Sequence, residues 1–187
     1  MTHSDTPAKR LSTPLEGTPA RVWDPSAAIA TPLNLHNPQV LPEWVDYNGH
    51  MSESCYLLVF GDNSDAFFRY VGIDETYRDV HGFSFYTVET HIHNLREAAL
   101  GAPLRLGLQL LDADDKRMHL FHSLTHAETG DLLATGEQML VHVDMAQGRA
   151  TPMPPWLHAR VHAVKAAHAV LARPKQAGAS IGIRRKT

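Results

Sequence analysis

A polar turn that runs directly into a long apolar segment is the feature that most constrains the fold of this 187-residue chain. The stretch begins at Trp44 and ends at Gly72, and its turn carries Asp46, Asn48 and His50. The glycine inside the turn can adopt backbone angles that are closed to other residues. A helix that is apolar on most sides is buried on most sides, so we expect later strands to wrap around it.

Signals at both ends set the bounds of this predicted helix. Ser52 is a favourable N-cap, and the Glu53 carboxylate suits the positive end of the helix dipole. At the other end, Gly72 suits the left-handed conformation in which many helices terminate. Asp65 and Arg69 are four residues apart, so we expect them to pair on one surface of the helix.

Alternating apolar residues predict four strands after the helix. They cover Phe83–Asn94, Leu104–Leu110, Met118–His126 and Leu132–Asp144. Short links after the second and third strands imply antiparallel hairpins. In the first strand the alternation places Phe85 and Glu89 on one face and Tyr86 on the other. An earlier stretch, Leu33–Val45, is strand-like, but its two prolines confine it to a sheet edge or an irregular entry.

Composition and charge exclude several classes of protein. The net charge of −3 gives no reason to expect a nucleic-acid partner. No apolar run reaches the roughly 18 residues that span a membrane, and the first residues lack the apolar core of a secretory signal. The single cysteine, Cys55, excludes an intrachain disulfide. We therefore expect a soluble, cytoplasmic protein with neither a nucleic-acid nor a membrane partner.

One domain with terminal additions is expected from the length and the local composition. Residues 1–31 are rich in Pro, Ser, Thr and Ala and predict a flexible arm. Residues 32–153 form the predicted domain, and residues 154–171 a C-terminal helix. Residues 172–187 form a basic tail, for which we expect solvation, or alternatively contact with phosphates.

The predicted order of elements, a strand, one long helix and four antiparallel strands, resembles the hotdog architecture. The turn Asp46-Tyr-Asn-Gly49-His50-Met51 is similar to the D-x-x-G-H-[VM] signature of acyl-CoA thioesterases of the 4-hydroxybenzoyl-CoA thioesterase type. This resemblance covers approximately Leu33–Met153. It implies an α+β hotdog fold, in which an antiparallel sheet of about five strands wraps a long central helix and an extra helix follows.

Two longer stretches narrow the resemblance. The segments VDYNGHMSESCYLLVFGDNSDAF and FYTVETHIHNLREA resemble the betainyl-CoA thioesterases of carnitine breakdown, which also occur fused to carnitine dehydrogenases. The likeness implies hydrolysis of betainyl-CoA to betaine and CoA, without a cofactor, and a functional link to carnitine dehydrogenase. Hotdog active sites usually form between subunits, so the resemblance also implies a homodimer or homotetramer.

The resemblance places Asp46 at the position of the catalytic carboxylate. Thioester hydrolysis needs attack on the carbonyl carbon and donors for the oxyanion, so Asp46 either forms an anhydride or acts as a base on water. Backbone N–H groups around Met51–Glu53 are the expected oxyanion donors, because the first N–H groups of a helix lack intrahelical partners. Asn48 would orient the water or the carbonyl, and His50 would support the turn. Alternatively, Asp46 and Asn48 only make a tight turn.

Asp62 is a second candidate for the catalytic carboxylate. It lies in the middle of the helix, near where one branch of these thioesterases carries a helix glutamate. A buried acid without a partner is costly, so Asp62 should have either a partner or a function. Asn63 is expected to line the same cleft. The alternative is a solvated or subunit-contacting patch that Asp62 shares with Asp65 and Arg69.

A quaternary ammonium group neither donates nor accepts a hydrogen bond, so aromatic faces or acids must recognise it. Glu89 or Asp62 would supply the opposite charge, and Ser52, Glu53 and Asn63 complete the expected substrate contacts. The alternative for each aromatic residue is a place in the core. The candidate aromatic faces are Trp44, Tyr47, Phe60, Phe85 and Tyr86.

Thirteen histidines raise the hypothesis of a metal site, above all His91 and His93 on one strand face. No cysteine or glutamate pattern with zinc-site spacing accompanies them, and the thioesterases that the chain resembles need no metal. We therefore expect none. Three alternative functions remain open: a thioesterase with another acyl preference, a hotdog hydratase, and a non-catalytic module that binds acyl-CoA.

Overall fold

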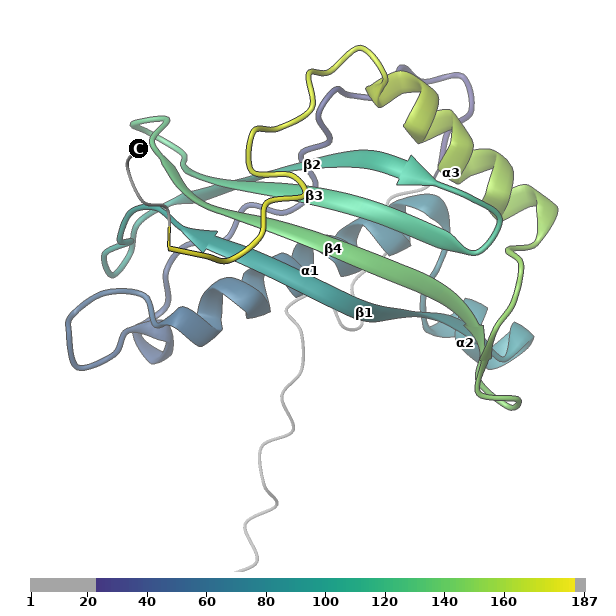
Figure 1. Cartoon of the computed structure of the whole chain (residues 1–187), viewed down its shortest axis with the longest axis horizontal. Helices are drawn as coiled ribbons and strands as arrows, with labels where there is room; N and C mark the ends of the chain where they lie inside the picture. Colours follow the sequence, from purple (N-terminus) through teal and green to yellow (C-terminus); the bar gives the residue numbers. More distant parts are fainter. Residues whose placement is uncertain (1–22, 184–187) are drawn as a thin grey trace, which may run out of the picture.

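The structure, a computed structural model, describes residues 23–183 (Figure 1). Most of the predicted arm therefore lies outside the described residues, as do Arg184, Arg185 and Lys186 of the predicted basic tail. Where the arm enters the described part of the chain, the ring of Trp23 packs on that of Tyr70, with 5.2 Å between their centroids.

The long helix α1 spans Glu53–Val71, as the sequence predicts. Ser52 occupies the N-cap position, although its side chain makes no capping hydrogen bond. Gly72 ends the helix in the left-handed region, with a φ of 99°, where glycine avoids the strain that a Cβ atom would cause. The predicted pair is present, since Arg69 Nε lies 2.8 Å from Asp65 Oδ2, and the same guanidinium also binds Glu75.

An antiparallel sheet packs against this helix. Its strands are β1 (Phe83–Asn94), β2 (Leu104–Ala113), β3 (Arg117–His126), β4 (Leu132–Asp144) and β5 (Arg149–Ala150). The strand order is β1-β4-β3-β2, and the short strand β5 pairs with β4. The stretch before the helix is not a continuous strand: isolated bridges at Leu33 and Gln39 tie it to the β2 side of the sheet, and Pro42–Trp44 is a 3-10 helix, η1.

Two further helices complete the described chain. Helix α2 spans Glu75–His81 in a region that the sequence suggested was only a connector, and Asp74 caps it by accepting from Tyr77 N at 2.9 Å. Helix α3 spans Pro155–His168, close to its predicted bounds, and packs along β2. None of the helices within residues 23–183 is long and apolar enough to cross a membrane.

The two faces of the sheet have different coverings (Figure 1). Helix α1 lies behind the sheet on what we call the inner face, and residues 172–181 cross in front of it on the outer face. Gly178 N donates to both carboxylate oxygens of Glu137, at 2.8 and 3.0 Å, which fastens this segment to β4.

The predicted alternation of β1 is wrong beyond Thr87, because a bulge lies between Thr87 and Glu89. One extra residue reverses the facing of those that follow. Glu89 consequently lies on the outer face, where it lines a cavity together with Glu137, and not beside Phe85, which is buried in the core.

The core on the inner face consists of two apolar clusters. One contains Phe67, Leu120 and Leu140, and the other contains Phe60 and Leu124. Five polar side chains, each at most 3% exposed, lie between them along α1, β3 and β4. We call this set the polar belt; its members are Asp62, Asn63, Ser64, His122 and Gln138.

Close packing of α1 on the sheet predicts a strong effect of one added methyl group. A Cβ atom at Gly136 would lie 2.8 Å from the ring of Phe60, so Gly136→Ala should lower the free energy of unfolding by about 1–3 kcal/mol. The control is Gly61→Ala, on an exposed part of α1 where a Cβ meets nothing within 4 Å, which should raise it by about 0.5–1 kcal/mol. Urea denaturation measures both, and a neutral Gly136→Ala would contradict this account of the packing.

Candidate active site

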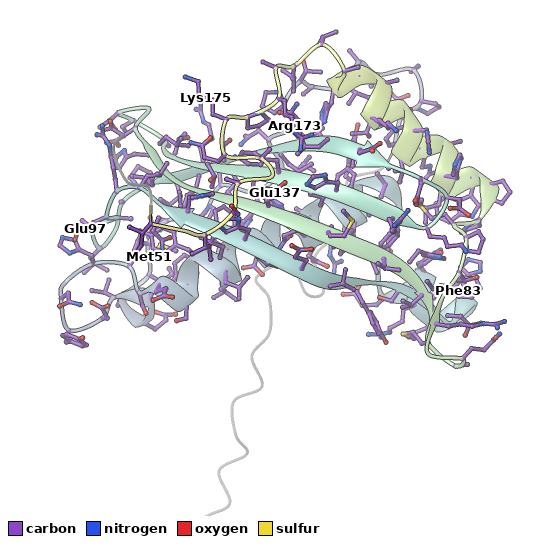
Figure 2. All side chains as sticks on the ribbon, viewed as in Figure 1. Met51, Phe83, Glu97, Glu137, Arg173 and Lys175 are labelled. Carbon is purple, nitrogen blue, oxygen red and sulfur yellow. The ribbon has the colours of Figure 1, made fainter. Side chains whose placement is uncertain are left out.

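The polar turn is a small closed loop in front of α1. Asp46 N donates to His50 O at 3.1 Å, and a bridge joins Val45 to Met51. Gly49 N donates to Asp46 O at 3.0 Å and has a φ of 82°, in the left-handed region that the sequence suggested a glycine would supply. Figure 2 shows Met51 at one end of the sheet and Phe83 at the other, so the turn marks one end of the fold.

The side chains of the turn bind mainly one another. Asp46 Oδ1 accepts from Asn48 N at 2.8 Å, and Asp46 Oδ2 lies 3.5 Å from Asn48 Nδ2. Within the single chain these two residues therefore stabilise the turn, which is the alternative that the sequence left open. His50 Nδ1 lies 3.4 Å from Glu97 Oε2, and a bridge ties His50 to Ala99, which agrees with a supporting role.

The N–H groups predicted to be oxyanion donors, those around Met51–Glu53, differ in whether they already have an acceptor. Met51 N donates to Ala98 O and Ser52 N donates to Trp44 O, both at 2.8 Å, so neither is available. The N–H groups of Glu53 and Ser54 have no acceptor among residues 23–183. A helix start with two free N–H groups is suited to stabilising an oxyanion.

Asp62 lies on α1 in an unusual environment. The residue is 1% exposed, and neither carboxylate oxygen has a hydrogen-bond partner among the described residues. Burial, with a smaller contribution from the negative charge of Asp65, raises the pKa of Asp62 to about 6. A carboxyl group whose pKa lies near neutral pH can exchange protons readily, as general acid–base chemistry requires.

Asn63, the neighbour of Asp62, faces the sheet and not an open cleft. It is fully buried, and its Nδ2 lies 2.9 Å from His122 Nδ1. Its Oδ1 has no partner among the described residues.

The two candidate carboxylates occupy different places along α1. Asp62 follows Glu53 by nine residues, which corresponds to about 14 Å along the helix axis. A single chain therefore does not bring Asp46 and Asp62 to one reaction centre.

A single chain also does not assemble the predicted aromatic cage. Trp44 and Phe60 belong to one apolar cluster, and Phe85 belongs to the other. Tyr47 is 97% exposed at the tip of the turn, and Tyr86 is half exposed on β1. These aromatic side chains are thus divided between the core and the surface, because closing α1 on the sheet requires large apolar groups.

The outer face carries a separate cavity of about 570 Å³ beneath the C-terminal segment. Its lining includes Glu89, His91 and Glu137, so the predicted countercharge Glu89 lies across the sheet from Asp62. The rings of His91 and His93 are 4.5 Å apart, but no third His, Cys, Asp or Glu of the described part of the chain joins them as a set of metal ligands.

Two members of the polar belt, Ser64 and Gln138, escaped the sequence analysis, and His122 entered it only as one of the histidines of the metal hypothesis. A signal was present, because His122 stands between Leu120 and Leu124 at an inward-facing position of β3. A polar residue at the apolar phase of a buried strand indicates a hydrogen-bonded network.

Comparisons with known proteins agree with this geometry. A model of the thioesterase-like superfamily matches residues 40–161. The L-carnitine dehydrogenase/betainyl-CoA thioesterase of Rhizobium meliloti is 44% identical over 90% of this chain, which spans 33% of that protein. The betainyl-CoA thioesterase of Pseudomonas aeruginosa is 42% identical over 81% of this chain and 95% of that protein. The chain thus spans about a third of the fused relative and nearly all of the separate one.

Solved structures extend the likeness to the fold. The protein SAV2348 from Staphylococcus aureus, solved in complex with CoA, superposes with a TM-score of 0.77 and 26% identity, over 84% of this chain and 100% of that one. A putative thioesterase from Pseudomonas putida gives a TM-score of 0.73 and 33% identity, over 82% and 98% respectively. The hotdog fold that the sequence predicts is therefore confirmed.

The raised pKa of Asp62 predicts a pH-dependent effect on stability. The folded chain binds this proton more tightly than the unfolded chain, so the carboxyl group lowers stability as pH rises from about 4 to about 6 and above. The free energy of unfolding of Asp62→Asn, relative to that of the wild type, should therefore rise by about 2–3 kcal/mol from pH 4 to pH 7.5. Urea denaturation at both pH values measures this difference, with the exposed Glu128→Gln as the control for loss of one charge. A difference that is constant with pH would contradict the assignment.

Proposed function

The chain belongs to the thioesterase-like superfamily, and from this premise we propose that it hydrolyses betainyl-CoA to betaine and CoA. The substrate is inferred from the Pseudomonas aeruginosa betainyl-CoA thioesterase, because 42% identity extends over almost the whole of that protein. The geometric observation that carries the reaction class is the start of α1, where the N–H groups of Glu53 and Ser54 have no acceptor among the described residues and directly follow the turn that holds Asp46.

The proposed reaction needs a carboxylate and two donors. A carboxylate removes a proton from water, the water oxygen bonds to the thioester carbonyl carbon, and the free N–H groups of Glu53 and Ser54 hold the oxyanion. The C–S bond then breaks, and the CoA thiolate takes the proton. Alternatively, the carboxylate itself attacks, CoA leaves, and water cleaves the resulting anhydride.

Asp46 is the first choice for the reacting carboxylate, because it occupies the signature turn directly before these donors. Its bond to Asn48 N keeps one oxygen engaged and leaves the other near Asn48 Nδ2. Asp62 is the second choice. It lies too far along α1 to share a reaction centre with Asp46 of its own protomer, so the two would meet only across a subunit interface.

We propose that a second copy of the chain supplies this interface. Strand β1 is at the free edge of the sheet, and Tyr86 and Val88 on it are 50% and 60% exposed. An exposed strand edge with apolar side chains is a ready surface for pairing with another chain. Such a homodimer, alone or within a homotetramer, would place the turn of one protomer against α1 of its partner.

The fused relatives suggest the setting of the reaction. In the Rhizobium meliloti protein, the matching region is part of an L-carnitine dehydrogenase/betainyl-CoA thioesterase. We propose that this chain serves the same breakdown of carnitine, in functional association with a carnitine dehydrogenase, and that it acts in the cytoplasm on its CoA ester.

Two charge-removing variants test the proposal. Asp46→Asn should lower kcat for betainyl-CoA by at least about a hundredfold, because it removes the reacting carboxylate while leaving a side chain that still accepts from Asn48 N. The assay is release of the CoA thiol, with the circular dichroism spectrum as a check on folding. If Asp62→Asn and not Asp46→Asn abolishes turnover, then Asp62 and not Asp46 is the reacting carboxylate.

The control and the contrary outcome follow from the chemistry. Glu128→Gln changes an exposed acid on the turn between β3 and β4, away from the candidate site residues, and should leave kcat within about threefold. A wild-type chain that binds betainyl-CoA but releases no thiol would contradict the proposed function and would favour a non-catalytic acyl-CoA-binding module.

A further inference from the structure

Three consecutive buried polar residues on α1 differ in how they are held. Asp62, Asn63 and Ser64 are 1%, 0% and 3% exposed, and successive residues of a helix are about 100° apart around its axis. They therefore cover about 200° of the surface of α1. The sheet binds the side chains of Asn63 and Ser64, whereas neither oxygen of Asp62 has a partner among the described residues.

His122 on β3 is the centre of the hydrogen bonds that hold α1. Its Nδ1 lies 2.9 Å from Asn63 Nδ2, and its Nε2 lies 3.1 Å from Gln138 Oε1. Ser64 Oγ donates to the same Gln138 oxygen at 2.6 Å. The polar belt thus joins α1 to two strands at once.

The protonation state of His122 agrees with these partners. Complete burial lowers its pKa to about 4, so the ring is neutral near pH 7. An Asn63 amide that donates to Nδ1 requires the proton on Nε2, from which the ring donates to Gln138 Oε1. Gln138 and Ser64 are uncharged, and Asp65 on α1 is the charged group that acts on neighbouring Asp62.

Apolar packing alone would fold α1 onto the sheet, but it is not directional. Hydrogen bonds are directional, so the polar belt can fix the rotation of α1 about its own axis. At about 5–6 Å from the helix axis, a rotation of roughly 20° moves a side chain by about 2 Å. A misplacement of about 1 Å can cost about a hundredfold in rate, so this rotation matters for a reacting group.

We infer that His122 is a positioning residue: by binding Asn63 it fixes the rotation of α1 and so the place of the Asp62 carboxyl group. The consequence for turnover rests on the proposed function with Asp62 taking part in the reaction, whereas the consequence for Asp62 itself does not. His122 touches no reacting atom in this role. It acts through α1, on which Asn63 and Asp62 are neighbours.

Two substitutions of His122 separate this role from simple packing. Asn at position 122 places an acceptor where Nδ1 stands, so His122→Asn keeps the bond from Asn63 and loses the reach to Gln138. Gln places its amide near the position of Nε2, so His122→Gln keeps the hydrogen bond to Gln138 and loses the one from Asn63. We expect His122→Asn to retain kcat within about threefold and the wild-type pH profile. We expect His122→Gln to lower kcat at least tenfold with little change in KM, and to shift the acid limb of the profile.

A second readout does not need turnover. The pKa of Asp62 is obtained from the pH dependence of the free energy of unfolding, measured with and without Asp62→Asn in each His122 variant. This pKa should remain near 6 in His122→Asn and should shift in His122→Gln. If the chain hydrolyses no CoA ester, the proposed function fails, but this titration still decides the role of His122.

Control variants keep the inference falsifiable. His142→Asn alters another fully buried histidine, held by Tyr77 and Thr151, and should lower stability without moving either pH profile. If His122→Gln does not fold, Asn63→Leu removes the same bond from the helix side and should reproduce the loss. Equal kcat values and equal titrations for His122→Asn and His122→Gln would overturn the inference.

Discussion

The packing of α1 on the inner face of the sheet is the constraint on which the rest of the structure depends. Gly136 on β4 allows the closest approach, because any larger residue would meet the ring of Phe60. Two apolar clusters hold the ends of the helix, and the polar belt lies between them. The belt contributes hydrogen bonds where apolar groups of similar size would serve burial equally well. Its presence therefore suggests a requirement for orientation and not only for stability.

The same packing explains why a single chain holds the proposed site residues without bringing them together. The signature turn stands at the start of α1, where two N–H groups have no acceptor among the described residues, and the buried carboxyl group lies about 14 Å further along the helix. Aromatic side chains suited to a quaternary ammonium group are either consumed by the core or left exposed, as Tyr47 is. In the proposed homodimer, a second copy of the chain at the free edge of β1 would bring these parts together.

The sequence predicts the fold well and the site only in outline. The bounds of α1, β1 and β4 follow from periodicity and from Gly72, because burial of one face repeats every turn of a helix or every second residue of a strand. The seven residues of α2 are too few for such a pattern. The bulge after Thr87, which turns Glu89 to the outer face, has no local signal. Contacts between distant elements, such as Asn63 with His122, depend on tertiary packing that periodicity does not encode.

Parallel assays of betainyl-CoA and 3,3-dimethylbutyryl-CoA test the central claim most directly. The two acyl groups have the same shape, and they differ in carrying nitrogen with a positive charge or neutral carbon at the centre of the trimethyl head. Recognition of the cation by an aromatic face or a carboxylate is worth about 1–2 kcal/mol or more, so the account predicts a kcat/KM at least about tenfold higher for betainyl-CoA. Equal values for the two esters, measured by thiol release, would contradict it.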